Sequence, residues 1–444
     1  MKHRIRILLI LPALLLTLFV TGQQRLSIEE AVAAALKNNY DIRLLKNDSA
    51  VYALNNSFAT AAFFPRVNAT NTVLFNNNNQ KQKLADGSER GGNGIRSNNE
   101  SASLNLNWTI FDGLKMFATR DKLAEFVKLG ELTIKNQLVT TVSDVIKTYF
   151  NIVRQKQQLK AIEEQMQINE ERVKQAEKKF SVGLGAKPEL LQAKLDLNAQ
   201  KAARLSQLNL VEQLKEQLNQ LTVFAPGTTY EVADSIPIDM NLSLGELYAS
   251  AEKNNPGLQV AKQNIKLANL TLRERKAERY PTVSLNGAYN FSKTNNQTVV
   301  NNFTPLFNRN LGFNYGATVA IPIFNGFTVK RQIKEAQLDI QYQSLLYDYQ
   351  KYRMDIAISS AFKDYELQKK NLALEEENIL LAKENVFIAV ERLRLGVSTT
   401  LELRETQRSL EESYNRLIAA RYNTKVAETE LLRLKGDLVK QALR

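Results

Sequence analysis

Residues 145–180 read VIKTYFNIVRQKQQLKAIEEQMQINEERVKQAEKKF, and residues 358–393 read ISSAFKDYELQKKNLALEEENILLAKENVFIAVERL. In both stretches an apolar residue returns at every seventh position, which is typical of supercoiled helices and too sustained for an ordinary globular helix. These positions are Val145, Ile152, Leu159, Met166, Val173 and Phe180 in the first stretch, and Ile358, Tyr365, Leu372, Ile379, Val386 and Leu393 in the second. The pattern therefore predicts two coiled coils.

The rest of the chain is repeated along with these two stretches. The same separation of 213 positions, 358 minus 145, relates Phe111-Asp112-Gly113 to Phe324-Asn325-Gly326. Before a loop of variable length the separation is 216, as between Phe64-Pro65 and Tyr280-Pro281 (280 minus 64). A repeat of more than about 200 residues indicates a duplicated half-molecule, because solenoid repeats are far shorter. The sequence thus predicts a signal peptide at 1–22, a first structural repeat at 23–221, a linker at 222–241 and a second structural repeat at 242–444.

Each repeat is predicted to begin with a helical stretch, from Ser27 to about Phe63 and from Ser243 to about Arg279. Ser27 followed by Glu30, and Ser243 followed by Glu246, have the spacing of a capping box at the start of a helix. An aromatic-proline pair ends each stretch, and proline cannot continue a helix. We expect the secondary structure to change there.

Beyond these prolines the side chains alternate between apolar and polar, as they do in strands with one apolar face. The alternating runs lie at residues 67–75, 103–110, 282–291 and 313–321. They predict one β-hairpin at about 65–111 and another at about 281–324. Between the runs of each hairpin lie Asn76–Glu100 and Ser292–Asn310, which are polar and rich in asparagine and are predicted to be long surface loops.

The longest predicted element of the first repeat is a helix from Leu114 to about Val182, roughly 100 Å long at about 1.5 Å per residue. Glycine interrupts the heptads at Gly183 and again at Gly396, and return helices are predicted to start near Pro188 and Thr400. Each repeat should therefore contain a long antiparallel helical hairpin with a tight end. The predicted hairpins lie at about 113–221 and about 326–435.

The start of the chain predicts export. Lys2, Arg4 and Arg6 precede an apolar run, Ile7–Val20, that is too short for a comfortable membrane span. A single amphipathic hairpin is explained equally well by a soluble protein and by a transmembrane β-barrel. Two such hairpins in an exported chain that lacks a long apolar helix favour the outer membrane. Four strands cannot close a barrel, since the smallest use about eight, so several copies would have to share one.

The side-chain inventory argues against catalysis. The chain has no Cys, and its one histidine, His3, lies inside the predicted signal peptide. Nucleophilic systems that use His, His-based metal sites and disulfides are thereby excluded, and we expect no enzyme activity, cofactor or metal site. The formal charge of +13 falls to +10 without the three basic residues of the signal. Charges of both signs are interspersed along the helices as on solvated coiled-coil faces, so we do not expect nucleic-acid binding.

A secretory signal, two β-hairpins, two very long helical hairpins and an internal duplication together resemble the TolC family of outer-membrane efflux proteins. The resemblance covers essentially the whole mature chain. It implies a homotrimer in which each protomer gives four strands to a shared outer-membrane β-barrel, while the helices continue as a hollow α-barrel through the periplasm. It also implies an exit duct that docks to a periplasmic adaptor protein and an inner-membrane pump.

The residues that match a sequence motif of the family lie at the predicted hairpin ends. In the family these ends contact the adaptor, which points to Arg392, Leu393, Gly396, Val397, Ser398 and Thr399 in the second repeat and to Lys179, Phe180, Gly183 and Leu184 in the first. The first set departs from the family pattern because it lacks the hydroxyl residues. Glycine at these positions is also explained by a left-handed turn alone.

Family members also narrow the periplasmic end of the tunnel with acidic residues. The candidates in this sequence are Glu164 and Glu171, which correspond through the repeat to Glu377 and Glu384. Carboxylates crowded around a pore would repel one another and hold cations, whereas on an outer face they would be ordinary solvating charge.

The sequence and this resemblance together predict a passive outer-membrane conduit, and because no phosphate-binding loop is visible we expect its energy to come from a partner. The expected location is the bacterial outer membrane, with the helical tunnel in the periplasm and membrane lipid around the strands. One alternative is a porin-like channel that works without a pump. Another is a secreted coiled-coil protein with a structural or adhesive role.

Overall fold

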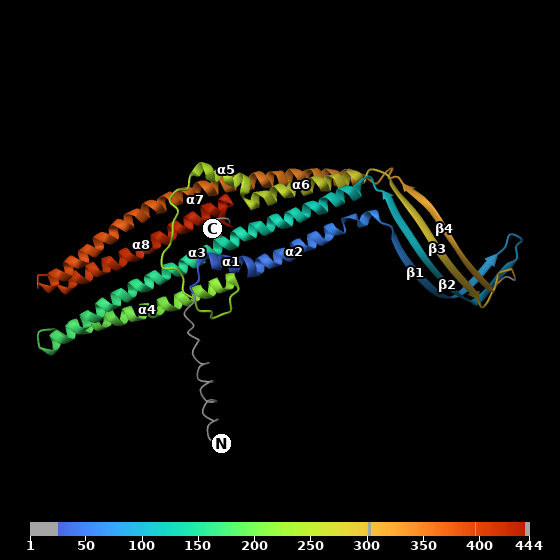
Figure 1. Ribbon diagram of the computed structural model, residues 1–444. Coiled ribbons are helices and arrows are strands. Elements are labelled where there is room, and N and C mark those ends of the chain that lie inside the picture. Colours follow the sequence, from blue (N-terminus) through green and yellow to red (C-terminus); the bar gives the residue numbers. More distant parts are fainter. Residues whose placement is uncertain (1–24, 301–302, 396, 440–444) are drawn as a thin grey trace, which may run out of the picture. The chain divides into compact units, whose positions relative to one another are not determined.

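The computed structural model describes residues 25–439 apart from 301–302 and 396, so the predicted signal peptide lies outside the described residues. Long helices and one sheet make up the described chain (Figure 1). The elements in chain order are α1 (Ile28–Asn38), α2 (Tyr40–Ser57), the 3-10 helix η1 (Ala59–Phe63), β1 (Arg66–Lys83), β2 (Glu89–Phe111), α3 (Lys115–Ser181), α4 (Lys187–Thr222), α5 (Leu244–Asn254), α6 (Pro256–Ala277), β3 (Thr282–Asn296), β4 (Phe307–Ala320), α7 (Thr328–Arg394) and α8 (Thr400–Lys435). Within the described ranges, no helix has an apolar stretch long enough to cross a membrane.

The chain forms two compact units that do not follow the order of the sequence. One unit comprises the chain up to Asn47, Leu132–Gln259 and the chain from Asp348 onward; the other comprises Asp48–Glu131 and Val260–Tyr347. Each unit therefore draws on both predicted repeats. The first unit holds most of the helical hairpins, and the second unit holds the sheet.

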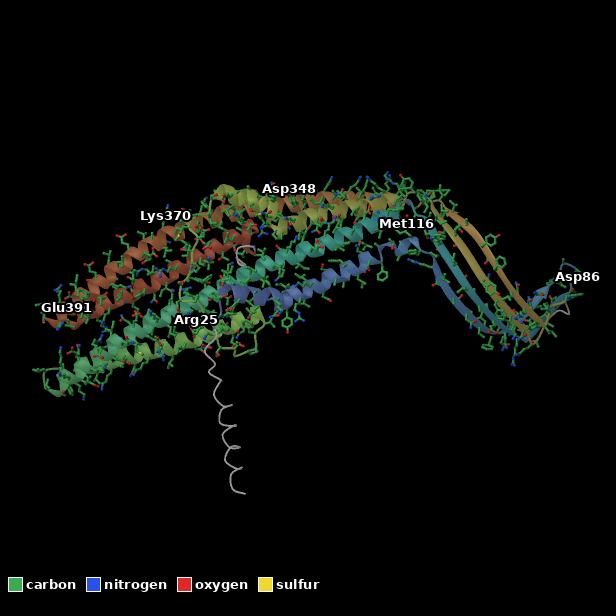
Figure 2. The ribbon with its side chains drawn as sticks, viewed as in Figure 1. Arg25, Asp86, Met116, Asp348, Lys370 and Glu391 are labelled. Carbon is green, nitrogen blue, oxygen red and sulfur yellow. The ribbon has the colours of Figure 1, made fainter. Side chains whose placement is uncertain are left out.

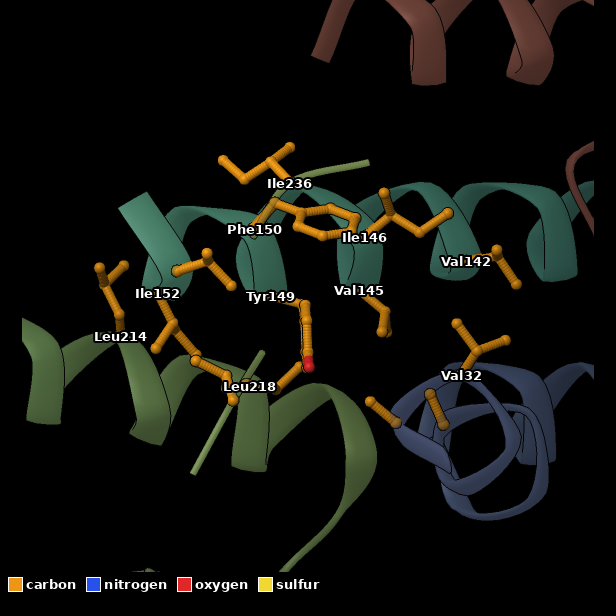
Figure 3. Close-up of a cluster of buried hydrophobic side chains, with 14 of the residues drawn as sticks. Val32, Val142, Val145, Ile146, Tyr149, Phe150, Ile152, Leu214, Leu218 and Ile236 are labelled. Carbon is orange, nitrogen blue, oxygen red and sulfur yellow. The ribbon is translucent and has the colours of Figure 1, made fainter. Parts of the chain in front are cut away.

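An apolar cluster of the first unit surrounds Tyr149 on α3 (Figure 3). Val32 of α1 and Leu218 of α4 face it, and all three side chains are buried. The Tyr149 hydroxyl donates to the Leu26 carbonyl (2.8 Å) and accepts from the Ala233 N–H (3.0 Å). One buried hydroxyl thus fixes both the chain before α1 and the segment between α4 and α5 against α3.

Two asparagines make equivalent hydrogen bonds in the two halves of the chain. Asn39 Nδ2 donates to the Leu221 carbonyl at the end of α4 (3.1 Å), and Asn255 Nδ2 donates to the Leu434 carbonyl at the end of α8 (3.0 Å). The Oδ1 of each asparagine accepts from a backbone N–H in the first turn of the following helix, as an N-cap does. An amide can do both because it carries donors and acceptors.

The predicted heptads form the contact surfaces of the helical hairpins. Ile358, Tyr365, Leu372, Ile379 and Val386 of α7 are all buried, as are Val145, Ile152 and Val173 of α3. Two polar residues interrupt the return helices, and both bond across the hairpin. Arg204 Nε donates to Glu163 Oε1 (2.8 Å), and the Thr424 hydroxyl donates to the Ala420 carbonyl (2.8 Å) and lies 3.3 Å from the Gln368 carbonyl.

The four strands form one antiparallel sheet in the order β1-β2-β3-β4 (Figure 1). Apolar side chains cover one face, and they include Leu104, Trp108, Tyr289, Phe313 and Tyr315, all of them exposed. The other face is polar. It carries a ladder in which Asn107 donates to Asn286 (2.7 Å) and Asn286 donates to Thr318 (2.8 Å). β1 and β4 are the free edges of this sheet.

The prediction that Asn76–Glu100 and Ser292–Asn310 form long surface loops was wrong. β1 and β2 stay paired to the Lys83–Glu89 pair, and β3 and β4 to the Asn295–Phe307 pair. These segments are rich in asparagine, glutamine and serine, so they lack the alternation of apolar and polar residues from which a strand is predicted. Their side chains can nevertheless hydrogen-bond across strands, as Asn76 does to Ser97 (3.2 Å). The strands are therefore longer than the roughly ten residues that alternation alone indicates.

Equivalent turns connect the strands to the long helices. Gly113 and Gly326 both have left-handed backbones (φ +71° and +60°), as do the residues that follow them, Leu114 and Phe327. Asp112 then caps α3 by accepting from the Met116 N–H (3.0 Å). Residues other than glycine rarely adopt a left-handed backbone. Because both turns contain one, the path of the chain, and not the local sequence preference, determines the geometry of these turns.

Candidate functional site

The end of the α3/α4 hairpin is a glycine turn. Gly183 is left-handed (φ +78°), its N–H donates to the Phe180 carbonyl (3.1 Å), and the Leu184 N–H donates to the Lys179 carbonyl (2.9 Å). This pair of bonds defines a Schellman cap. Gly185 is required for another reason, because an added Cβ would lie 2.9 Å from the Phe180 nitrogen.

The end of the α7/α8 hairpin has the same long backbone bond. The Val397 N–H donates to the Arg392 carbonyl (3.0 Å), and these two residues correspond to Leu184 and Lys179 through the separation of 213. Gly396, the predicted equivalent of Gly183, lies outside the described residues. The two hairpin ends therefore share a backbone bond that spans their turns.

Glu402 organises the second hairpin end and was missed from the sequence. Its Oε1 pairs with Arg392 Nη1 (3.1 Å), and its Oε2 accepts from the Ser398 hydroxyl (2.7 Å). Its backbone N–H donates to the Thr399 hydroxyl (3.2 Å), which caps α8. The spacing from Thr399 to Glu402 is that of a capping box, so the signal was present in the sequence. The equivalent position in the first repeat is Glu189.

Apolar side chains are left exposed at both hairpin ends. Leu184 is 83% exposed and Val397 is 64% exposed, and Phe180, Leu395 and Leu401 are also exposed. Leu393 is partly covered. Two equivalent turns that each present large apolar side chains are a typical feature of a surface that another protein covers.

A partly buried carboxylate joins the two hairpins near these ends. Asp196 on α4 accepts from Arg172 of α3 and from Gln192 (2.8 Å), and Arg404 of α8 lies 3.4 Å from it. The Asp196 side chain is 18% exposed. Burial by itself would raise the pKa of this carboxyl, but the hydrogen bonds from Gln192 and Arg172 and the charges of both arginines outweigh burial and lower its pKa.

A groove of about 870 Å³ lies beside this carboxylate and is bounded by α3, α4, α7 and α8. Its lining includes three residues singled out from the sequence, Glu171, Lys179 and Leu393, together with Arg172 and Arg404. The structure thus brings candidates from both hairpin ends and one gate candidate to the same groove. Asp196 and its arginines were not predicted, because they come from separate helices with no common sequence period.

The four gate candidates occupy different surroundings. Glu164 lines a second cavity of about 300 Å³ between α3, α4 and α8, and Glu171 pairs with Lys174 (2.7 Å). Glu377 and Glu384 are exposed on α7, and in the described part of the chain neither has an ion-pair partner. The predicted equivalence of the two pairs through the repeat therefore does not extend to equivalent contacts.

Two helices carry exposed apolar stripes, in which the side chains recur every three, four or seven residues and so share one helical face. On α2 and just beyond it they are Tyr40, Leu44, Val51, Leu54 and Phe58; on α7 they are Leu338, Tyr342, Leu345, Tyr349, Tyr352 and Ile356. All are between 48% and 68% exposed. Such long apolar faces are far larger than a soluble monomer normally leaves uncovered.

Within the described residues there is no cluster of three or more His, Cys, Asp or Glu side chains that could hold a metal. The described arrangement at the hairpin ends consists of turns, exposed apolar side chains and ion-paired carboxylates, among them Glu402 and Asp196.

A family model described as outer membrane efflux protein matches residues 31–225 and 247–437 of the chain. Among curated proteins, the outer membrane efflux protein BepC of Brucella suis is 24% identical over 440 residues, which cover 96% of this chain and 89% of BepC. The outer membrane protein TolC of Escherichia coli is 24% identical over 361 residues, covering 80% of this chain and 73% of that protein.

Solved structures of similar fold include two outer-membrane proteins. The CmeC outer membrane channel of Campylobacter jejuni superimposes with a TM-score of 0.75 at 18% identity, covering 93% of this chain and 88% of CmeC. The outer membrane protein VceC of Vibrio cholerae gives a TM-score of 0.73 at 14% identity, covering 92% and 96% of the two chains.

Proposed function

The chain belongs to the outer membrane efflux protein family, a family of outer-membrane channels with a periplasmic helical tunnel, and we propose that it is the exit duct of a tripartite efflux or secretion system. In that role it conducts cargo passively and depends on an inner-membrane pump and a periplasmic adaptor. The observation that carries the proposal is the amphipathic sheet with two free edges, which continues into helical hairpins with exposed apolar ends.

The assembly we propose is a homotrimer, the state of TolC-like outer-membrane factors. The free edge of β4 would pair with β1 of the next copy, and three copies would contribute twelve strands to one closed barrel. α7 follows β4 and α2 precedes β1, so the same contact would bring the stripe on α7 against the stripe on the neighbouring copy's α2. Such a head-to-tail interface closes into a ring.

We further propose that the chain is an internal duplication with the boundaries predicted above, a signal peptide at 1–22, repeats at 23–221 and 242–444, and a linker at 222–241. The equivalent hydrogen bonds of Asn39 and Asn255 support this proposal. The matched backbone bonds at the two hairpin ends support it as well.

The adaptor is proposed to dock at the hairpin ends, on the apolar residues around Leu184 and Val397. The gate is proposed to lie close to these ends, where Asp196 of α4 contacts Arg404 of α8. Docking would separate the hairpins and break this contact, which opens the duct. At least one of Glu164, Glu171, Glu377 and Glu384 is proposed to face the duct, and alanine at Glu377 and Glu384 should then change the single-channel conductance or the cation preference.

The test combines assembly, conductance and export. The double variant Gly396→Pro with Arg392→Glu should still form trimers and conduct in planar bilayers, but should abolish export in cells. Because this variant alters the backbone, Leu184→Ser with Val397→Ser provides a milder second test of the same surface. Normal export from both variants would show that the hairpin ends are turns only. A channel that supports export in cells lacking the adaptor and the pump would instead favour the porin-like alternative.

A further inference from the structure

A row of charged side chains crosses the apolar face of the sheet. Glu100 of β2 pairs in register with Lys293 of β3, and Lys293 pairs with Arg309 of β4. Each residue is separated by an even number of positions from an apolar residue on its own strand, as Glu100 is from Leu104, so the row shares the apolar face. Arg96 lies on the same face of β2, four residues farther from the helices than Glu100.

The distance of this row from the helix end of the sheet matches the thickness of the apolar layer of a membrane. Ten residues separate Arg309 from Val319 on β4, and ten separate Lys293 from Val283 on β3. At about 3.3 Å per residue and a strand tilt of about 40°, ten residues rise about 25 Å, which is the height of the apolar band of a transmembrane barrel. The row therefore lies at the far boundary of the hydrocarbon layer, and because the helices are periplasmic, that boundary is in the outer leaflet.

The positive charges of this row and of Arg96 are not compensated by ion pairs within the described residues. In the described part of the chain no carboxylate forms an ion pair with Lys293, Arg309 or Arg96. The Arg309 guanidinium lies 5.6 Å from the centre of the Phe291 ring, which holds it against the top of the apolar band. Elsewhere in the same hairpins a lysine is neutralised, since Lys81 pairs with Glu89 (2.9 Å).

We propose that Lys293 and Arg309, supported by Arg96, bind the phosphate of a phosphorylated outer-leaflet lipid on the outside of the barrel. Guanidinium groups hold phosphate through paired N–H donors, and an ammonium adds a point charge. Three cations face one carboxylate, Glu100, so the patch keeps a net positive charge. The lipid's acyl chains would run along the apolar face below, beside Phe291 and Phe313. The inference rests on the proposed membrane barrel.

The experiment uses the full-length trimer in nanodiscs of phosphatidylcholine doped with bisphosphorylated lipid A, with bound lipid counted by native mass spectrometry. The wild type should retain up to three lipid A molecules per trimer. The double variant Lys293→Gln with Arg309→Gln should retain at least about tenfold less. The matched control, Arg66→Gln with Lys83→Gln, removes the same charge at the other end of the sheet and at the tip of the β1/β2 hairpin, and should retain lipid A like the wild type.

Three outcomes would overturn the proposal. Equal retention of dephosphorylated lipid A would show that only the acyl chains are recognised. Equal loss in the control would show a general charge effect. Displacement of lipid A by millimolar inorganic phosphate would indicate a site for free phosphate. Conductance is also recorded in planar bilayers for the wild type and each variant. A wild-type trimer that conducts but retains no lipid A would refute the lipid-binding proposal alone. A wild-type chain that never inserts into the bilayer would refute the proposed exit duct.

Discussion

At the scale of single residues, Asp196 carries one of the polar contacts between the two hairpins, through Arg404. Its pKa is lowered in the folded protein, so the contact contributes stability that is complete above the unfolded pKa of about 3.9 and is lost as the pH falls through the lower folded value. Acid therefore weakens the contact by protonating Asp196.

We expect Asp196→Asn to open the duct at neutral pH. The amide keeps the shape of the side chain but loses the charge that holds Arg172 and Arg404, at a cost of about 1.5–3 kcal/mol for the charged hydrogen bonds. Single-channel conductance at pH 7 should rise to the level that the wild type reaches only below about pH 4. Asp364→Asn, which alters an exposed carboxylate that accepts from Gln368, should leave conductance unchanged. A variant that conducts like the wild type at pH 7 would remove Asp196 from the gate.

Glu402 provides a second prediction at this scale. Replacing it with alanine removes the ion pair to Arg392 and the bond from Ser398, which together should destabilise the turn by about 1 kcal/mol. Amide hydrogen exchange in residues 397–403 should then become about fivefold faster. Glu189→Ala, the change at the equivalent position of the first repeat, removes no ion pair in the described structure and should have no such effect. Equal effects of the two changes would show that the two ends are held in the same way.

Residues of the second hairpin end were predictable because their pattern is local. Arg392, Ser398 and Thr399 follow one another closely, and the capping-box spacing would also have given Glu402. The contact of Asp196 with Arg404 was not predictable. Their side chains meet only after two separate hairpins pack together, and a long-range ion pair leaves no period in the sequence.

At the scale of elements, the predictability of a segment depended on its periodicity. The coiled-coil helices were predictable because most of the heptad residues that indicate them are also residues that the helices bury. The outer parts of the strands were not readable, because in a sheet with one polar face an asparagine-rich run such as 76–82 pairs without any apolar signal. Backbone pairing, supplemented by bonds such as Asn76 to Ser97, holds these parts together.

The turns from strand to helix allow a matched test of backbone geometry. Gly113 and Gly326 are both left-handed, so alanine costs about 1 kcal/mol at either position. At Gly113 an added Cβ would also lie 2.3 Å from the Ala277 carbonyl oxygen, whereas at Gly326 it would meet open space. Gly113→Ala should therefore lower the midpoint of thermal unfolding clearly more than Gly326→Ala. A similar loss from both changes would mean that the Ala277 backbone moves aside freely.

At the scale of the whole molecule, the surface that the chain leaves exposed is the argument for assembly. Two free sheet edges and two apolar stripes are found on one protomer, and they lie on different elements. A head-to-tail arrangement uses all of them at once. The sequence predicted the need for several copies from the number of strands, but it did not identify the stripes, since the heptads of the buried coiled coil run through the same long helix.

The last prediction tests the stripes directly. Leu345→Glu on α7 places a charge in the middle of a face that we expect to be buried between copies, and it leaves the protomer fold intact because Leu345 is 68% exposed in the single chain. The cost of burying an unpaired carboxylate should convert trimers to monomers in detergent, as measured by light scattering after size exclusion. Leu184→Glu adds the same charge at the hairpin end, outside the proposed interface, and should remain trimeric. A Leu345→Glu trimer as stable as the wild type would require a different face of α7 to meet the neighbouring copy.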